Sequence, residues 1–325
     1  MNKDTIVDWG KAFQGNIASL DFVFGGLLAG TVGGIIAPGG AGKSFLGLGI
    51  CTCLTTKDIL GLNIEPQDHQ VCYVTAEDPK QILEHRALSL ASHLNPQERE
   101  RIQKFVTLQS IHGTTPCLIN SKGERDEQWI GGLKRAATGK RLLIIDPLRK
   151  FHQGEENDSG HMTLLTQVLD EVASQTDCAI LFLHHANKLT TLSGQGGSQA
   201  ASRGSSALVD NIRYQLNLMG MTEQEAQALG VDKECRSRFV KLIGSKANYA
   251  ENVEDHWLRR AEGGVLVKAV LDTPEKVKQA KKRKDEFNKA DTAKDKGSNP
   301  TTPLDPSDPS SFKAAGEMSH KDIFG

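Results

Sequence analysis

The chain has 325 residues, and its 39 Lys and Arg against 40 Asp and Glu give a net charge of −1. This balance excludes a polybasic or strongly acidic protein, so nucleic acid would have to bind a local patch. No apolar run approaches the roughly 18 residues that span a bilayer, and residues 1–10 lack the apolar core of a secretory signal. We therefore expect a cytoplasmic protein that binds no membrane.

Short apolar strands alternate with helical segments between residues 31 and 183. The expected strands are Thr31–Ala37, His69–Thr75, Phe105–Gln109, Arg141–Ile145 and Ala179–Leu183. The expected helices are Lys43–Thr55, Pro79–Leu94, Asp126–Thr138 and His161–Gln175. Because apolar strands that alternate with helices are typical of a parallel sheet covered on both faces, we predict an α/β fold with a mostly parallel central sheet.

After Asp210 the pattern changes to strands that are joined mostly by short turns. These strands are expected at Asn211–Leu218, Arg238–Gly244, His256–Arg260 and Gly264–Val270. They predict an antiparallel C-terminal extension of the same sheet.

The composition changes again at about residue 273. Residues 275–296 are rich in charge, and residues 299–311 contain four prolines. Such a segment cannot bury enough apolar surface to fold alone, so we predict a disordered tail over 273–325. It follows a core over 30–272 and an N-terminal segment over 1–29, which we expect to pack on the core or on a neighbouring subunit.

The chain has six cysteines. Cys51 and Cys53 are too close together for the usual C-x-x-C half of a zinc site, and no second half follows. We interpret the cysteines as small, mostly buried residues of a reduced protein.

A glycine-rich loop between the first strand and the first helix predicts a phosphate-binding site. Its residues are Ala37, Pro38, Gly39, Gly40, Ala41, Gly42, Lys43 and Ser44, followed by Phe45. They fit the P-loop pattern, in which backbone N–H groups and a helix N-terminus surround phosphate oxygens. Lys43 would neutralise the β- and γ-phosphates of ATP, and the Ser44 hydroxyl would bind Mg²⁺.

Carboxylates follow two further strands. Asp146 ends a strand, where it would hold Mg²⁺; a strand-end Asp on its own is more often a turn or cap residue, but the P-loop earlier in the chain favours the metal role. Glu77 follows the second strand and could orient or deprotonate the attacking water. Glu77 and Asp78 could instead cap the next helix, an interpretation that we prefer for Asp78 only.

His184 and His185 end the strand that begins at Ala179. Successive residues of a strand point to opposite faces, so only one of the two is expected to reach the γ-phosphate. We favour His185 over His184.

Two long irregular segments, Arg149–Gly160 and Leu189–Ser206, follow strand ends. Loops of this length are usually functional or unstructured. We expect the second loop to contact DNA through Arg203, and through Lys188 just before it, although a mobile surface loop is the alternative. Arg213 could serve as an arginine finger for a neighbouring subunit, with a surface salt bridge as an equally good interpretation and Lys246 as a second candidate.

These motifs together resemble the RepA-type hexameric replicative DNA helicases of IncQ-like plasmids, within the RecA-fold helicase superfamily. The matching segments are Gly30–Ser44, Ala76–Pro79, Leu183–Ala186, Ala201–Arg213, Gly244–Tyr249 and Gly263–Leu266. The resemblance covers roughly residues 6–272 and implies a RecA-like P-loop NTPase core.

By the same resemblance, the protein would form a hexameric ring that moves 5′ to 3′ on single-stranded DNA with ATP and Mg²⁺, in the replication of a plasmid or mobile element. A replication initiator and a primase would be its partners. Arg213 would act across the subunit interface. Related helicases carry a K-x-R pattern one strand later, whereas this chain has Ser245-Lys246-Ala247, so that role is not transferred.

Two other functions are compatible with the same motifs. One is a RecA-fold ATPase that serves as a recombination mediator or regulator without unwinding DNA. The other is a DNA-binding repressor with a vestigial nucleotide site, which the intact Lys43, Glu77 and Asp146 disfavour.

Overall fold

The computed structural model describes residues 6–15, 17–185, 206–272 and 274–279. By its internal contacts the chain divides into two units, Met1–Thr273 and Pro274–Gly325. The second unit is described only over a short helix at 274–279, so most of the expected tail lies outside the described residues.

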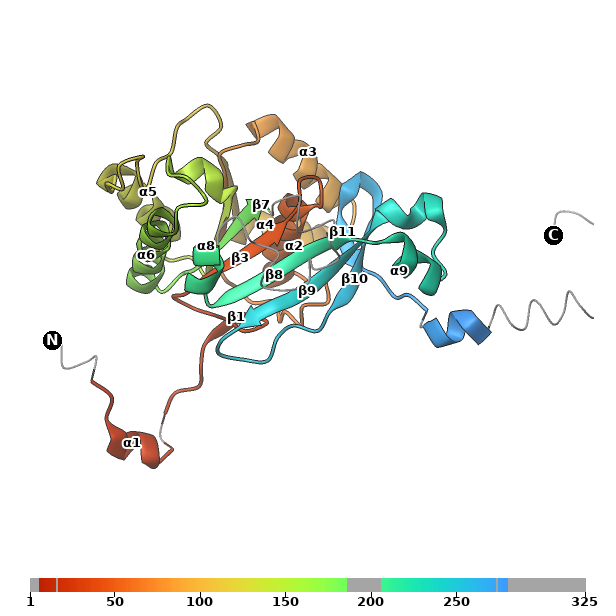
Figure 1. The fold of residues 1–325 in the computed structure, drawn as a ribbon, viewed down its shortest axis with the longest axis horizontal. Coiled ribbons are helices and arrows are strands. Elements are labelled where there is room, and N and C mark those ends of the chain that lie inside the picture. Colours follow the sequence, from red (N-terminus) through yellow and green to blue (C-terminus); the bar gives the residue numbers. More distant parts are fainter. Residues whose placement is uncertain (1–5, 16, 186–205, 273, 280–325) are drawn as a thin grey trace, which may run out of the picture. The chain divides into compact units, whose positions relative to one another are not determined.

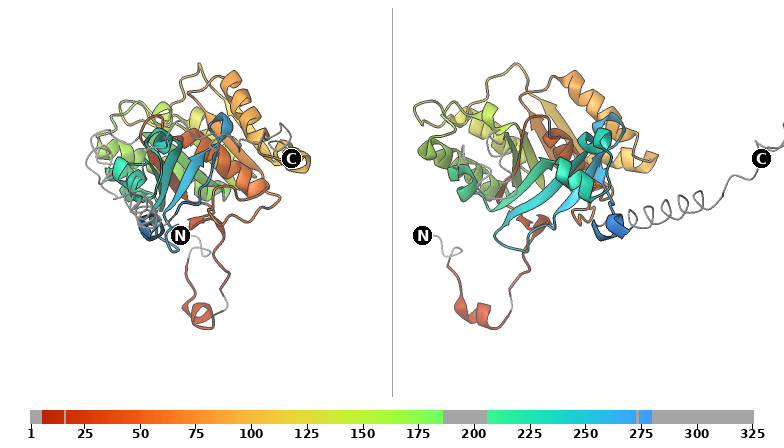
Figure 2. Two further views of the ribbon diagram at one scale, coloured as in Figure 1. Left: turned by 90° about the vertical axis from the view of Figure 1, so that its right-hand side faces the viewer. Right: turned by 45° about the vertical axis from the view of Figure 1, so that its right-hand side comes forward.

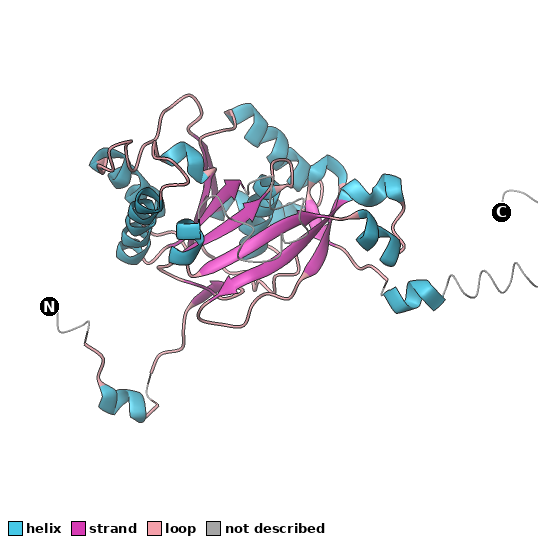
Figure 3. Cartoon of the chain, viewed as in Figure 1, coloured by secondary structure: helices cyan, strands magenta, loops and turns pink. Residues whose placement is uncertain are grey.

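One sheet forms the centre of the first unit (Figures 1 and 3). Its strands are β3 (Val32–Ala37), β4 (Val71–Thr75), β5 (Val106–Ser110), β6 (Leu142–Asp146), β7 (Ala179–His185), β8 (Tyr214–Gly220), β9 (Phe239–Ala247), β10 (His256–Arg260) and β11 (Leu266–Lys268). Within the described residues these nine strands take the order β11-β10-β9-β8-β3-β7-β6-β4-β5. Neighbours from β8 to β5 pair in parallel, and those from β8 to β11 pair antiparallel. The predicted α/β sheet with an antiparallel extension is confirmed.

The strand expected at Asn211–Leu218 differs from the prediction in its start and in its pairing. Its first residue belongs to helix α8 (Ser206–Asn211), and β8 begins at Tyr214. β8 lies parallel to β3, with Tyr214 opposite Gly33, so the antiparallel extension begins only at β9. The physical reason is the long connection from β7 through α8, because such crossovers join parallel strands.

Helices cover both faces of the sheet, as the two views of Figure 2 show. Helices α2 (Lys43–Thr55) and α3 (Lys80–Ala91) share a core cluster with one face, and α5 (Glu127–Ala137), α6 (Ser159–Thr176) and α8 share a cluster with the other. On β6, Leu142 and Ile144 join the first cluster, whereas Leu143 and Ile145 join the second. This alternation decides which face each strand end offers to a ligand.

Helix α4 (Pro96–Phe105) is absent from the sequence prediction. Its start carries a local signal, because Asn95 and Glu98 form a reciprocal capping box and Pro96 takes the first turn. Only Phe105 is buried, so the helix has no apolar periodicity that would reveal it.

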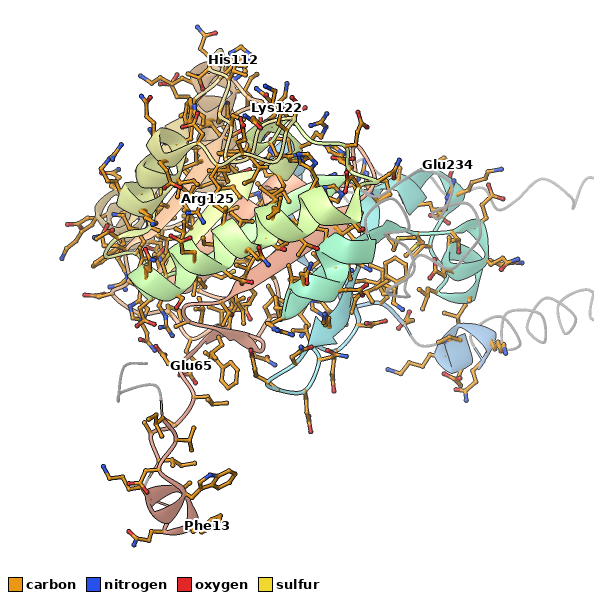
Figure 4. All side chains as sticks on the ribbon, turned by 60° about the vertical axis from the view of Figure 1, so that its left-hand side comes forward. Phe13, Glu65, His112, Lys122, Arg125 and Glu234 are labelled. Carbon is orange, nitrogen blue, oxygen red and sulfur yellow. The ribbon has the colours of Figure 1, made fainter. Side chains whose placement is uncertain are left out.

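The N-terminal residues differ in how they pack. Helix α1 (Trp9–Phe13) has no buried residue, and Phe13, labelled in Figure 4, is 81% exposed. The hairpin of β1 (Phe22–Phe24) and β2 (Leu27–Leu28) instead places Val23, Phe24 and Leu27 in the core.

The other described elements are helix α9 (Glu223–Ala228) and the 3₁₀ helices Leu148–Phe151, Lys233–Arg238 and Glu262–Gly264. The first of these 3₁₀ helices places Leu148 and Phe151 in the core cluster that α5, α6 and α8 share. All six cysteines are unpaired, and only Cys235 is not buried. Among the helices described, none is both long and apolar enough to cross a membrane.

Candidate nucleotide-binding site

The loop from Ala37 to Lys43 joins the end of β3 to the start of α2. Gly40 and Gly42 have φ angles of 74° and 104°, a left-handed conformation that side chains rarely adopt. Among the described residues, adjoining ones apart, no atom lies within 4 Å of the positions that Cβ atoms would take at Gly39 and Gly40. The loop therefore leaves open space at the N-terminus of α2, where backbone N–H groups and the helix dipole favour an anion.

Lys43 lies at the floor of this space. Its Nζ donates to the carbonyl oxygens of Ala37 at 2.9 Å and Pro38 at 3.0 Å, and lies 3.2 Å from His185 Nδ1. Burial lowers the pKa of Lys43 to about 8, although the nearby Asp146 and Glu77 oppose this shift. An anionic ligand group in the loop would add counter-charge beside this buried ammonium.

Ser44 and Asp146 meet beside Lys43. Ser44 Oγ donates to Asp146 Oδ2 at 2.7 Å, and the Tyr73 hydroxyl donates to the same oxygen. Burial raises the pKa of Asp146, whereas the hydrogen bonds from Tyr73 and Ser44 oppose this shift. No cluster of three or more His, Cys, Asp or Glu in the described part of the chain could hold a metal alone. The hydroxyl and single carboxylate do fit Mg²⁺, which usually takes few protein oxygens and completes its shell with phosphates and water.

Glu77 follows β4 with an exposed side chain, and it lines the same cavity. The Thr75 hydroxyl accepts hydrogen bonds from the N–H groups of Glu77 and Asp78, which fixes this turn. The capping role expected for Asp78 was wrong, because α3 has no side-chain cap and Asp78 instead forms an ion pair with Arg86 at 2.5 Å. The charged hydrogen bond from the Arg86 guanidinium, two turns further along α3, decides the orientation of the Asp78 carboxylate.

The two histidines at the end of β7 point to opposite faces. His185 lies on the α2 face, beside Lys43, and burial together with Lys43 lowers its pKa. His184 is buried on the other face, with its Nδ1 at 4.0 Å from Glu156 Oε1, and burial lowers its pKa to about 4. Of the two candidates, only His185 lines the cavity.

The cavity has a volume of about 300 Å³ and includes two arginines that sequence reasoning missed, Arg86 and Arg260. Arg260, on β10, donates to the carbonyl oxygens of Gly40 at 3.0 Å and Ala41 at 2.6 Å. Arg86, on α3, lies over the Phe45 ring at 5.8 Å. Arg86 could have been suspected from its place two helical turns after Asp78, whereas nothing local marks Arg260.

Two further candidates, Arg213 and Lys246, do not line this cavity. The Arg213 N–H donates to Val32 O, at the opposite end of β3 from the loop, and the Arg213 side chain is exposed. Lys246 Nζ donates to the carbonyl oxygens of Val209 and Asp210. Lys188 and Arg203 lie outside the described residues.

The segment expected to be irregular over Arg149–Gly160 is partly regular. It begins within the 3₁₀ helix Leu148–Phe151 and ends in the first turn of α6, which Asp158 caps. Arg149 donates to His152 O at 3.0 Å and lies 3.7 Å from Glu156, so both bonds hold it within its own loop.

Comparisons with known proteins agree with this geometry. The model of the family described as "AAA domain" matches residues 3–191. The structure titled "ATPase Domain of G40P" is similar with a TM-score of 0.56 and 16% identity, over 80% of this chain and 96% of that one. A DnaB-like replicative helicase, whose title adds its interactions with primase, is similar with a TM-score of 0.55 and 14% identity, over 81% of this chain and 65% of that one. At these identities the likeness shows the fold, and it confirms the predicted RecA-like P-loop architecture.

Proposed function

We propose that this chain, which belongs to the AAA domain family and is an ATP-hydrolysing enzyme, is a DNA helicase. It would move along single-stranded DNA as a ring of six subunits. The observation that carries this proposal is the cavity of about 300 Å³, which gathers Lys43, Ser44, Glu77, Asp146 and His185. These groups come from four separate segments of the sequence, and together they provide what phosphoryl transfer from ATP to water requires.

The phosphates of ATP would bind in the loop from Ala37 to Ser44, and Phe45 would line the same cavity. Gly39 and Gly40 leave room for phosphate oxygens, and the Lys43 ammonium lies below that space. Ser44 and Asp146 would hold Mg²⁺, which when bound supplies positive charge to the phosphate oxygens.

Glu77 would orient or deprotonate the attacking water. Its carboxylate is exposed at the cavity, so water reaches it, and its backbone is fixed by Thr75. His185 contacts Lys43 and therefore lies where the loss of the γ-phosphate changes the local charge. It would pass this change to the segment after β7, which contains Lys188 and Arg203, the proposed DNA contacts.

Arg213 would complete the site of a neighbouring subunit. It lies at the end of the sheet away from its own cavity, and its guanidinium makes no hydrogen bond or ion pair with another described residue. An arginine in this state is free to reach across an interface, where a finger of this kind accelerates hydrolysis by about 10³–10⁵.

The finer parts of the proposal rest on the family resemblance. They are movement from 5′ to 3′, a role in plasmid or mobile-element replication, cooperation with an initiator and a primase, and a cytoplasmic location. One of the similar structures carries primase in its title, which supports the primase partnership.

Unwinding of a forked DNA duplex by the purified chain with ATP and Mg²⁺ tests the proposal. We expect strand separation that is lost in Lys43→Ala, and faster separation of the fork whose single strand presents a 5′ end for loading. ATP hydrolysis stimulated by DNA but without strand separation would favour the alternative, a RecA-fold ATPase that acts as a mediator or regulator.

A further inference from the structure

Tyr73 is a buried residue to which the mechanism above assigns no task. It lies in the middle of β4, and its side chain is fully buried. A Cβ atom at Gly47, in α2, would lie only 3.0 Å from Tyr73 Cε2 and 3.6 Å from Ile144 Cγ2. The P-loop helix therefore carries a glycine at the point where the tyrosine ring lies beneath it, between α2 and β6.

The sheet directs this side chain towards the site. β4 pairs in parallel with β6, with Tyr73 opposite Ile144 and Thr75 opposite Asp146. Tyr73 and Ile144 belong to the core cluster on the α2 face. A tyrosine side chain is longer than an aliphatic one. From the position opposite Ile144, its hydroxyl therefore reaches Asp146, two residues further along β6.

Asp146 Oδ2 accepts two hydrogen bonds, from Ser44 Oγ and from Tyr73 Oη. The Ser44 hydroxyl donates its single hydrogen to Asp146, so the lone pairs of its oxygen remain available for a cation. Tyr73 has no such second task, because it is buried below the cavity and does not line it. Its hydrogen bond holds the carboxylate from behind, and through the carboxylate it holds the Ser44 hydroxyl.

We propose that Tyr73 is a positioning residue of the magnesium site, which acts through Asp146 and Ser44 and lowers the Mg²⁺ concentration at which nucleotide is held. This rests on the proposed use of ATP with Mg²⁺ in this cavity. Partners of metal ligands act in this way in many sites, and their loss costs about 10- to 100-fold in metal affinity.

The chain supplies a matched control for the removal of one buried hydroxyl. Tyr214, on β8, is 1% exposed and belongs to the same core cluster. Its hydroxyl makes no hydrogen bond to any described residue. Tyr73→Phe and Tyr214→Phe thus remove the same atom from the same kind of surroundings, but only the first removes a bond to Asp146.

The experiment measures binding of a fluorescent ADP analogue to the full chain while Mg²⁺ is titrated, and binding of Mn²⁺ by electron paramagnetic resonance in the presence of ADP. For Tyr73→Phe we expect the half-saturating Mg²⁺ concentration to rise about 10- to 100-fold. Nucleotide affinity in EDTA, without metal, should stay within about twofold of wild type. Tyr214→Phe should match wild type in both measurements.

Three outcomes would overturn the proposal. The first is an unchanged Mg²⁺ midpoint in Tyr73→Phe, and the second is an equal loss of nucleotide binding with and without metal, which indicates a merely structural role. The third is a wild-type chain whose nucleotide binding does not respond to Mg²⁺, which overturns the proposed metal site together with this inference. Because only the third outcome concerns the wild-type chain, the two failures are distinguishable.

Discussion

Lys43 Nζ and His185 Nδ1 lie 3.2 Å apart, although 142 residues separate them in the sequence. A protonated Lys43 can only donate, so in this contact Nδ1 would accept and the neutral ring would carry its proton on Nε2. The contact joins the start of α2, which follows β3, to the end of β7. The strands β3 and β7 are adjacent and parallel, so both ends meet at the cavity. A change of charge at Lys43 would therefore act directly on the His185 ring.

Glu77→Gln should separate nucleotide binding from hydrolysis. The amide keeps the size of the side chain but cannot take a proton from water, so ATP turnover should fall by about 10²–10⁴. Phosphate release measures turnover, and a fluorescent nucleotide should bind with nearly unchanged affinity. Glu84→Gln, at an exposed ion pair with Lys80 on α3, is the matched control and should behave as wild type. Normal turnover in Glu77→Gln would exclude the catalytic role.

Arg213→Ala should keep nucleotide binding and lose turnover by about 10³–10⁵, because the residue would act on the neighbouring site. Mixing tests the action in trans. Arg213→Ala chains retain Lys43, and Lys43→Ala chains retain Arg213, so mixed rings contain some interfaces with both residues intact. We expect hydrolysis to reappear in the mixture, as measured by phosphate release.

Two results would contradict the assignment of Arg213. One is normal turnover in Arg213→Ala alone, and the other is no recovery in a mixture that demonstrably assembles. Lys246→Ala serves as the control for loss of a nearby cation, because Lys246 is held by the carbonyl oxygens of Val209 and Asp210.

Arg260→Ala should weaken nucleotide binding by about tenfold. The variant removes two hydrogen bonds to the carbonyl oxygens of Gly40 and Ala41, one exposed and one partly buried, and a tenfold loss corresponds to about 1.4 kcal/mol. Arg259→Ala, an exposed neighbour on the same strand, should leave the affinity unchanged. Calorimetric titration of ADP gives both affinities, and equal affinities in the two variants would exclude a role of Arg260 in shaping the loop.

Two buried histidines should make the fold sensitive to acid. Burial lowers the pKa of both His152 and His184 to about 4, and Arg149 disfavours their protonation further. An unfolded histidine has a pKa of about 6.5, so between pH 6.5 and 4 the unfolded chain binds more protons than the folded chain. The free energy of unfolding should therefore decrease as the pH is lowered from 6.5 to 4, by up to about 1.4 kcal/mol per pH unit for each histidine.

Urea unfolding at pH 7 and pH 5 measures this dependence. His152→Leu should lose a smaller part of its stability between the two values than wild type, because one of the two groups is gone. His112→Leu, at an exposed histidine labelled in Figure 4, should keep the wild-type difference. An identical pH dependence in all three proteins would show that the buried histidines do not contribute.

The sequence alone was sufficient for the features that depend on neighbours in the chain. The apolar run before Ala37, the glycines after it and the helix from Lys43 are local, so the P-loop and its strand could be predicted. The strands that end at Thr75 and at Asp146 could be placed for the same reason. The alternation of side chains along β7 predicted that only one of the two histidines reaches the cavity. Helix α4 was missed although its capping signal is local, because its apolar pattern is weak.

Only the tertiary structure decided what depends on residues distant in sequence. Arg260 reaches Gly40 across 220 residues, and Tyr73 reaches Asp146 across 73, through strands whose order and register no local pattern contains. The strand β8 pairs in parallel with β3 because the chain crosses the sheet before it, and no local pattern marks that crossing. Hydrogen bonds and charge pairs act over a few ångström in space whatever the separation along the chain, so these partners become visible only once the strands are assembled.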